Sequence, residues 1–177
     1  TPCGTLFPYT TLFRSKEDFA WGLRVGFITY ASPGLDDDAI GALEQKTIGS
    51  LRAVVSNTSN LSQHMLLKVM NDPAYERQKQ DARDILEGRY RELKAKLESR
   101  RSSDPDSPLT VLPFNSGYFM SFDCGKVDAE ALRQALLDRG IGTISIAGRY
   151  LRVAFAAVEE ESIGELIDEI YDAAAGM

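Results

Sequence analysis

The order of patterns along the sequence predicts a mixed chain, in which an α/β part is followed by a small α+β part. Three observations support this prediction: a strand-like run precedes two amphipathic helices, a long charged helix comes next, and short strands then alternate with two further helices. A lone strand followed by helices cannot complete a sheet by itself. We therefore expect the first part to be the tail of a larger α/β domain whose upstream sequence is missing.

The composition disfavours several classes of function. The 177-residue chain has a net charge of −6, and an acidic surface repels the phosphate backbone of nucleic acids. No apolar run approaches the roughly 20 residues that a membrane-spanning helix needs. Cys3 and Cys124 provide neither a disulfide framework nor a metal-binding pattern. The single histidine, His64, lies in an expected helix and is interpreted as structural or solvated, which disfavours a histidine triad or a zinc site.

The first fifteen residues do not resemble the start of a protein domain. They contain no acidic residue and no helical period, and the tripeptide Thr-Leu-Phe occurs at 5–7 and again at 11–13. The basic start and the long apolar core of a signal peptide are missing. Because residues 5–15 look like the translation of a common sequencing adapter, we expect 1–15 to be an artefactual segment. The alternative is a true N-terminal strand.

The segment Lys16–Tyr30 combines two residues that together suit a phosphorylated carbonyl compound. Lys16 lies eight residues before Arg24, which opens a run that favours a buried strand, 24–30. Lysine amines form Schiff bases with carbonyl cofactors such as pyridoxal phosphate. Arginine offers a planar fork of donors that matches phosphate geometry. The alternative interpretation is an ordinary basic pair beside a core strand.

This segment resembles the class I and II aminotransferases, which are fold-type I pyridoxal-phosphate enzymes. The resemblance is carried by Lys16 and by the motif GLRVG at 22–26, whereas Phe19 departs from the small or aliphatic residue usual at its position. It implies that Lys16 is the catalytic residue that holds pyridoxal 5'-phosphate and that Arg24 binds the cofactor phosphate. Together with the adapter-like segment before it, the resemblance implies that the natural sequence is truncated at this lysine, so that the family's upstream cofactor-binding groups are absent.

Two helices are expected after the strand. A turn at 31–34 precedes three aspartates at 36–38, which the helix macrodipole favours in a first turn. An apolar stripe reaches Val55, a polar break covers 56–60, and a second helix is expected over 61–70. Arg52, followed by Ser-Asn at 56–57, resembles a family motif that in some members contacts the neighbouring subunit's site. Arg52 is therefore a candidate for a substrate contact across a dimer, and the alternative is an exposed helix arginine.

The longest periodic segment predicts a solvated helix that joins two domains. Asp72 is a suitable N-cap and Pro73 suits a first helical position. Apolar residues then recur at helical spacing among many charges over 74–101. The apolar seam is too short and irregular for a coiled coil. In the resembled family, a long helix links the large and small domains.

The remainder of the chain predicts a compact α+β unit. A loop covers 102–108, and the elements expected after it are strands over 109–112 and 117–123, a helix over 129–139, strands over 141–146 and 150–156, and a helix over about 159–174. Asp128 is the expected cap of the first helix and Gly140 its stop. The run 115–119, Asn-Ser-Gly-Tyr-Phe, resembles the family's small-domain strand beside the substrate pocket. The expected domain bounds are 16–72 for the remnant of the large domain, 73–101 for the interdomain helix and 102–177 for the small α+β domain.

Arg152 lies in an expected strand with alternating apolar residues. The two-residue period places it on the face of Tyr150, opposite Leu151 and Val153. It would then simply point to solvent. In the resembled family, however, a Tyr-x-Arg-aliphatic strand near the C-terminus supplies the arginine that binds the substrate α-carboxylate, which makes Arg152 the substrate-binding candidate. Arg149 ranks second.

Taken as a whole, the resemblance implies part of an aminotransferase that transfers an amino group between an amino acid and a 2-oxo acid. It also implies a homodimer, and we expect a cytoplasmic location. The composition, as described above, favours no metal, nucleic-acid or membrane partner. Related folds run decarboxylation or C–S lyase chemistry with the same lysine and arginine, so these reactions stay open, as does a noncatalytic α+β module. The piece alone is expected to be inactive.

Overall fold

The structure is a computed structural model that describes residues 18–30 and 33–177. The chain divides into two compact units, Thr1–Gln80 and Asp81–Met177, and the division falls inside the helix α4 (Tyr75–Ser103). The domain bounds expected from the sequence, after residues 72 and 101, stay predictions. Within the described ranges, no helix has both the length and the apolar character needed to cross a membrane.

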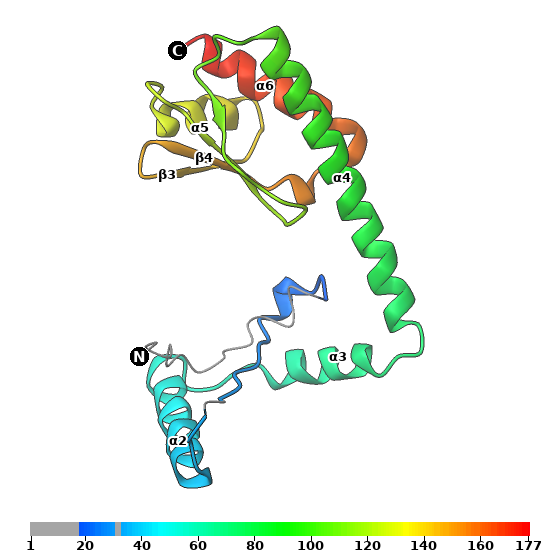
Figure 1. Cartoon of the computed structure of the whole chain (residues 1–177), viewed down its shortest axis with the longest axis vertical. Helices are drawn as coiled ribbons and strands as arrows, with labels where there is room; N and C mark the ends of the chain where they lie inside the picture. The colour runs from blue at the N-terminus through cyan, green and yellow to red at the C-terminus, as the bar shows by residue number, and fades with distance from the viewer. Residues whose placement is uncertain (1–17, 31–32) are drawn as a thin grey trace. The chain divides into compact units, whose positions relative to one another are not determined.

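The first unit contains the two helices that the sequence predicted. After a short 3₁₀ turn, η1 (Trp21–Leu23), come α2 (Asp37–Val54) and α3 (Asn60–Met70), both visible in Figure 1. The Asp36 side chain caps α2 by accepting a 2.9 Å hydrogen bond from the Ala39 amide. The Ser59 hydroxyl does the same for α3. The predicted helices are therefore confirmed, with capping by short polar side chains.

The buried strand expected over 24–30 is not formed. This segment has no regular structure, and Phe27 and Ile28 are each 52% exposed. A strand needs a neighbour to take up its backbone hydrogen bonds, and the described residues of the first unit include no other strand. The apolar stripe of α2 lacks cover as well, because none of its residues is buried.

The second unit is built on a four-stranded antiparallel sheet. The strands are β1 (Thr110–Val111), β2 (Met120–Asp123), β3 (Ile144–Ile146) and β4 (Tyr150–Val153). Their order across the sheet is β1-β2-β4-β3. Each strand lies inside a range predicted from the sequence, so the α+β prediction for this part is confirmed. The strand expected over 150–156 ends sooner, because residues 155–157 turn into a 3₁₀ helix, η2 (Phe155–Ala157).

Helices cover one face of this sheet. α5 (Ala129–Asp138) packs on β3, β4 and α6 (Ile163–Ala175), as Figure 1 shows. Asp128 caps α5 with 2.8 Å hydrogen bonds from two backbone amides, and Gly140 ends it with a φ of +83°, which suits glycine. The last helix begins later than predicted, because a 3₁₀ turn, η3 (Glu160–Ser162), precedes it.

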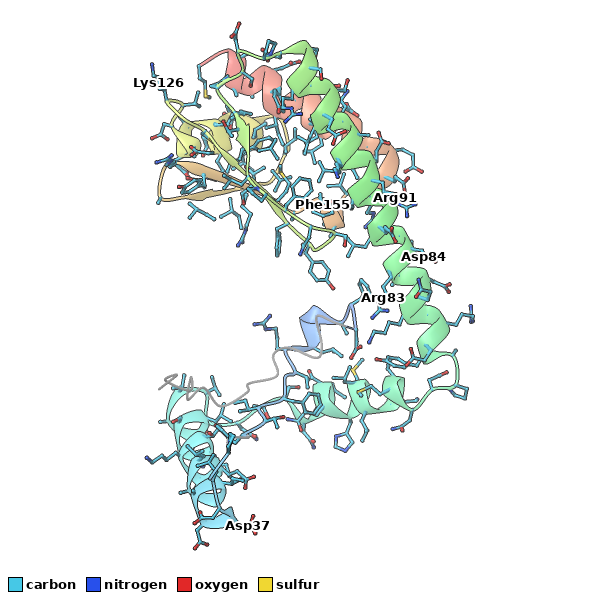
Figure 2. The ribbon with its side chains drawn as sticks, in the orientation of Figure 1. Asp37, Arg83, Asp84, Arg91, Lys126 and Phe155 are labelled. Carbon is cyan, nitrogen blue, oxygen red and sulfur yellow. The ribbon has the colours of Figure 1, made fainter. Side chains whose placement is uncertain are left out.

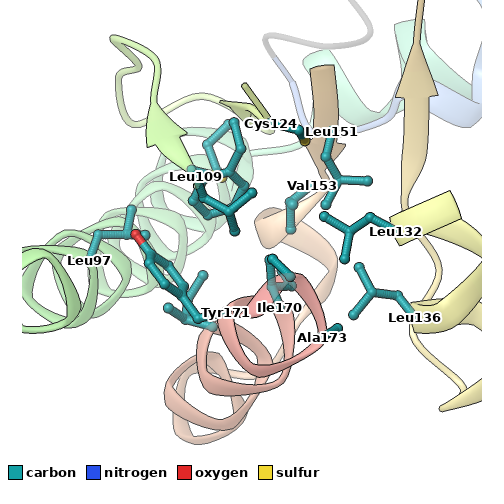
Figure 3. Packing of buried hydrophobic residues seen from close by; sticks show 14 of the residues in the cluster. Leu97, Leu109, Cys124, Leu132, Leu136, Leu151, Val153, Ile170, Tyr171 and Ala173 are labelled. Carbon is teal, nitrogen blue, oxygen red and sulfur yellow. The ribbon is translucent and has the colours of Figure 1, made fainter. Parts of the chain in front are cut away.

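The core of the second unit lies between the sheet and three helices. Figure 3 shows side chains from the sheet, α5, α6 and the later turns of α4 meeting there. The members are apolar and nearly inaccessible: Leu93, Leu97, Met120, Phe122, Leu132, Leu136, Leu151, Val153, Phe155, Ile163, Ile167, Ile170 and Tyr171, among others. At the edge of the core, Lys96 on α4 pairs with Asp168 on α6 at 2.6 Å. Packing therefore fixes the strands that carry the site described below.

Replacing Phe155 by alanine should destabilise the second unit severely. The ring, which is labelled in Figure 2, is fully buried and makes an edge contact with the Phe114 ring at 6.3 Å between centroids. Its loss leaves a cavity directly after β4, so we expect the free energy of unfolding to fall by about 3–5 kcal/mol. Denaturant unfolding followed by circular dichroism measures this change. The matched control is Phe119→Ala, since that ring is 44% exposed; equal losses at both positions would contradict the prediction.

Candidate functional site

Lys16, the predicted catalytic residue, lies outside the described residues, and the description of the cofactor segment begins at Asp18. From there the chain turns through η1, where the Leu23 amide donates to the Ala20 carbonyl at 3.0 Å. Arg24 follows this turn directly, with a φ of +54°, in the left-handed region that non-glycine residues rarely adopt. The turn presents Arg24 as an exposed side chain.

Among the described residues, no side chain competes with an anion for the Arg24 guanidinium. Within the described part of the chain it makes no hydrogen bond and no ion pair, and it is exposed. A planar fork of donors without an internal partner matches the geometry of a phosphate. The residue types at 16 and 24 therefore fit the cofactor that the sequence implies, an aldehyde that carries a phosphate.

Arg152 lies in the middle of β4, on the sheet face opposite the core. The register pairs it with Ser121 on β2 and with Ile144 on β3. Its neighbours in the chain, Leu151 and Val153, are buried, as the two-residue period predicted. The arginine side chain is half-buried on the other face, among partly exposed apolar residues such as Ile144.

The Arg152 guanidinium stacks on an aromatic ring and has no carboxylate partner. Its central carbon lies 4.7 Å from the centroid of the Phe119 ring. Among the described residues no hydrogen bond or ion pair reaches this guanidinium, and its Nε is buried without an acceptor. A half-buried arginine in this state retains its capacity to bind a carboxylate. The ring restricts the orientation of the guanidinium plane.

Arg149, the second-ranked candidate, is already paired. Its Nε and Nη2 atoms donate to the Asp123 carboxylate, with the shortest contact at 2.6 Å. These hydrogen bonds hold the pKa of Asp123 below its usual range, with help from the Gly125 amide. A substrate carboxylate would have to compete with Asp123 for Arg149, whereas it would meet no such competitor among the described residues at Arg152.

The pair formed by Asp123 and Arg149 should make stability depend on pH. The carboxyl pKa is lower in the folded than in the unfolded state, so the pair stabilises the fold above the ordinary aspartate pKa of about 4. That contribution is lost as the pH falls through the folded pKa. We expect Asp123→Asn to lower the melting temperature at pH 7 and to have little effect near pH 2. An equal difference at both pH values would contradict this. Glu87→Gln, in an exposed ion pair with Arg91, is the control.

A shallow hollow lies where the chain leaves β1 and enters β2. Its volume is about 470 Å³, and residues 112–115 and 119–121 line it. The lining therefore includes both ends of the run 115–119 that was expected beside a substrate pocket. Asn115 shapes the loop by accepting a hydrogen bond from the Gly117 amide at 3.1 Å.

The remaining candidates make local contacts. Arg52 is exposed near the end of α2 and donates to the Ser56 carbonyl at 3.2 Å, as an ordinary helix arginine can. Its contact with a neighbouring subunit stays a prediction. His64 is exposed on α3, with a ring nitrogen 3.0 Å from the Asn60 carbonyl oxygen. Within the described ranges, no group of three or more acidic, histidine or cysteine side chains is placed to hold a metal ion.

Two contacts of the site were not found from the sequence. Phe119 lies under Arg152, and Asp123 pairs with Arg149. Phe119 directly precedes β2 and Asp123 ends it, and both share the face opposite Met120 and Phe122. The two-residue period in that segment gives the face, but only the pairing of β2 with β4 brings these side chains to their arginines. Arg24 belongs to the first unit and Arg152 to the second.

The chain matches a known protein family and resembles solved structures. Residues 15–170 match the family described as aminotransferase class I and II. A search of curated proteins gives no match. Solved structures of similar fold include an aminotransferase from Anaerococcus prevotii DSM 20548, at a TM-score of 0.68 and 23% identity, covering 93% of this chain and 38% of that chain.

Two further solved structures show the same likeness. LysN, the alpha-aminoadipate aminotransferase of Thermus thermophilus, complexed with N-(5'-phosphopyridoxyl)-L-leucine, has a TM-score of 0.67 at 19% identity, over 93% of this chain and 41% of that chain. The kynurenine aminotransferase of Pyrococcus horikoshii, in complex with PMP, has a TM-score of 0.65 at 16% identity, over 89% of this chain and 38% of that chain. The chain thus spans about two fifths of the length of these structures, and the likeness confirms the predicted fold.

Proposed function

The chain belongs to the family of class I and II aminotransferases, and on this premise we propose that it forms part of a pyridoxal-phosphate-dependent enzyme. The reaction is the transfer of an amino group between an amino acid and a 2-oxo acid. The observation that carries the proposal is the Arg152 guanidinium, which lies on the Phe119 ring without a carboxylate partner among the described residues. A homodimeric assembly, which the family resemblance implies, and a cytoplasmic location belong to the same proposal.

Three side chains have distinct roles in this proposal. The Lys16 amine holds the cofactor and moves a proton at the substrate Cα. Arg24 binds the phosphate, for which its exposed guanidinium is available. Arg152 binds the substrate α-carboxylate, and its planar fork orients the bonds at Cα, because orientation decides which of them breaks. When bound, pyridoxal phosphate supplies an electron sink.

Product analysis on the longer protein tests this function. Equal amounts of keto acid from the amino donor and of newly aminated acceptor are expected for transfer. Release of carbon dioxide, or of ammonia with a thiol, without amination of the acceptor would instead indicate a decarboxylase or a C–S lyase. Absence of visible absorbance after loading with pyridoxal phosphate would favour the noncatalytic module.

A further inference from the structure

The Asp18 carboxylate is a buried charge close to Lys16 in the chain. Its side chain is 1% exposed. It accepts a hydrogen bond from the Tyr75 hydroxyl at 2.6 Å and another from the Lys79 ammonium at 2.7 Å. Both partners belong to the start of α4, more than fifty residues further along the chain. Two such hydrogen bonds to a buried carboxylate hold the Asp18 side chain in place within the first unit.

The two partners of Asp18, Tyr75 and Lys79, also contact each other. Tyr75 and Lys79 are four residues apart on one face of α4. The Lys79 ammonium donates to the Tyr75 hydroxyl at 3.1 Å and lies 5.3 Å from the centroid of its ring. The hydrogen bond with Asp18 is the largest of the contacts that raise the Lys79 pKa, so this amine stays charged at neutral pH. The donors are therefore arranged by the helix itself.

Lys16 lies outside the described residues, but covalent geometry ties it to the anchored Asp18. Two residues of extended chain span at most about 7 Å, so a change in the position of Asp18 is passed on to the chain at residue 16 through only two residues. On the other side of Asp18, the η1 turn fixes the path toward Arg24. One ion pair thus ties the segment that bears both cofactor residues to the start of α4.

We propose that Asp18 is a positioning residue for Lys16, and that it acts by anchoring the cofactor segment to Tyr75 and Lys79. This inference rests on the function proposed above, which makes Lys16 the cofactor lysine. A displacement of about 1 Å in a reacting group can lower a rate about 100-fold. Removing one partner of a buried ion pair leaves the other charge uncompensated, so both members are needed.

The test compares Asp18→Asn, Lys79→Met, the double variant and the milder Tyr75→Phe in the longer protein. Glu87→Gln is the control, since it breaks an exposed ion pair on the same helix. The first readout is hydrogen exchange of amides 18–24 in the protein without cofactor. The second is the pH midpoint of the visible absorbance of the lysine-bound cofactor, and the third is kcat.

We expect Asp18→Asn and Lys79→Met each to raise exchange of these amides at least tenfold, to shift the absorbance midpoint, and to lower kcat about 10- to 100-fold. The double variant should be no worse than the singles, Tyr75→Phe should show a smaller change of the same kind, and Glu87→Gln should match the wild type.

Two results would overturn the inference. Unchanged exchange in Asp18→Asn would show that the anchor does not hold the segment. Faster exchange with an unchanged absorbance midpoint and kcat would make Asp18 a structural residue without a positioning role. If the wild-type protein shows no cofactor absorbance, the proposed function fails and the positioning role fails with it, whereas the exchange result still establishes or refutes the anchor.

Discussion

Replacing Lys16 by alanine is expected to remove the visible absorbance of the bound cofactor and to lower kcat by about 10⁴-fold or more. The lysine is proposed both to hold the cofactor and to move the proton at Cα, and general acid–base catalysis alone contributes about 10²- to 10⁴-fold. Spectra and steady-state kinetics of the longer protein give both quantities.

Two further variants make this prediction specific. Lys16→Arg keeps the positive charge but cannot form the covalent bond, so it should lose as much activity as Lys16→Ala. Lys46→Ala, which removes an exposed lysine of α2, should behave like the wild type. Retained absorbance in both Lys16 variants would show that another lysine holds the cofactor.

Replacing Arg152 by glutamine is expected to lower kcat/KM for the amino acid by about 10²- to 10⁴-fold, mainly through a higher KM. Each hydrogen bond to a charged group contributes about 1.5–3 kcal/mol, and a bidentate carboxylate pair contains two of them. Steady-state kinetics with varied amino acid measure the change. Arg152→Lys should recover only part of the loss, because an ammonium lacks the planar fork.

Arg149→Gln is the variant that separates the two arginine candidates. Arg149 already pairs with Asp123, so its loss should change stability near neutral pH and alter kcat/KM only a few-fold. If Arg149→Gln raised KM as strongly as Arg152→Gln, the carboxylate site would have to be reassigned. Visible absorbance should persist in both variants, because neither arginine is assigned to the cofactor.

Most elements of the second unit could be predicted from the sequence because each buries one face within the unit. The two-residue period of β4 and the helical period of α6 both reflect the same local core. The expected strand over 24–30 failed for the opposite reason. Its residues have the composition of a buried strand, but a strand needs neighbouring strands to form a sheet. The described residues of the first unit contain no such strand.

The site was predictable in its residue types but not in its contacts. Spacing and resemblance selected Arg24 and Arg152. The sequence could not show that Arg149 is paired whereas Arg152 is not, because this depends on the register that brings Asp123 beside Tyr150. The anchor at Asp18 was missed for the same reason, since its partners lie on a distant helix and no local period connects them.

Because Cys124 is buried, its reactivity can report local opening of the core of the second unit. Its sulfur lies within the core, and burial raises the pKa of the thiol, so a nucleophilic thiolate forms only when the packing around it opens. In a Cys3→Ser background, the rate of alkylation at this position would follow the transient exposure of the second unit. The alkylation rate would therefore also report how often the packing around β4, the strand that carries Arg152, opens in the absence of cofactor and substrate.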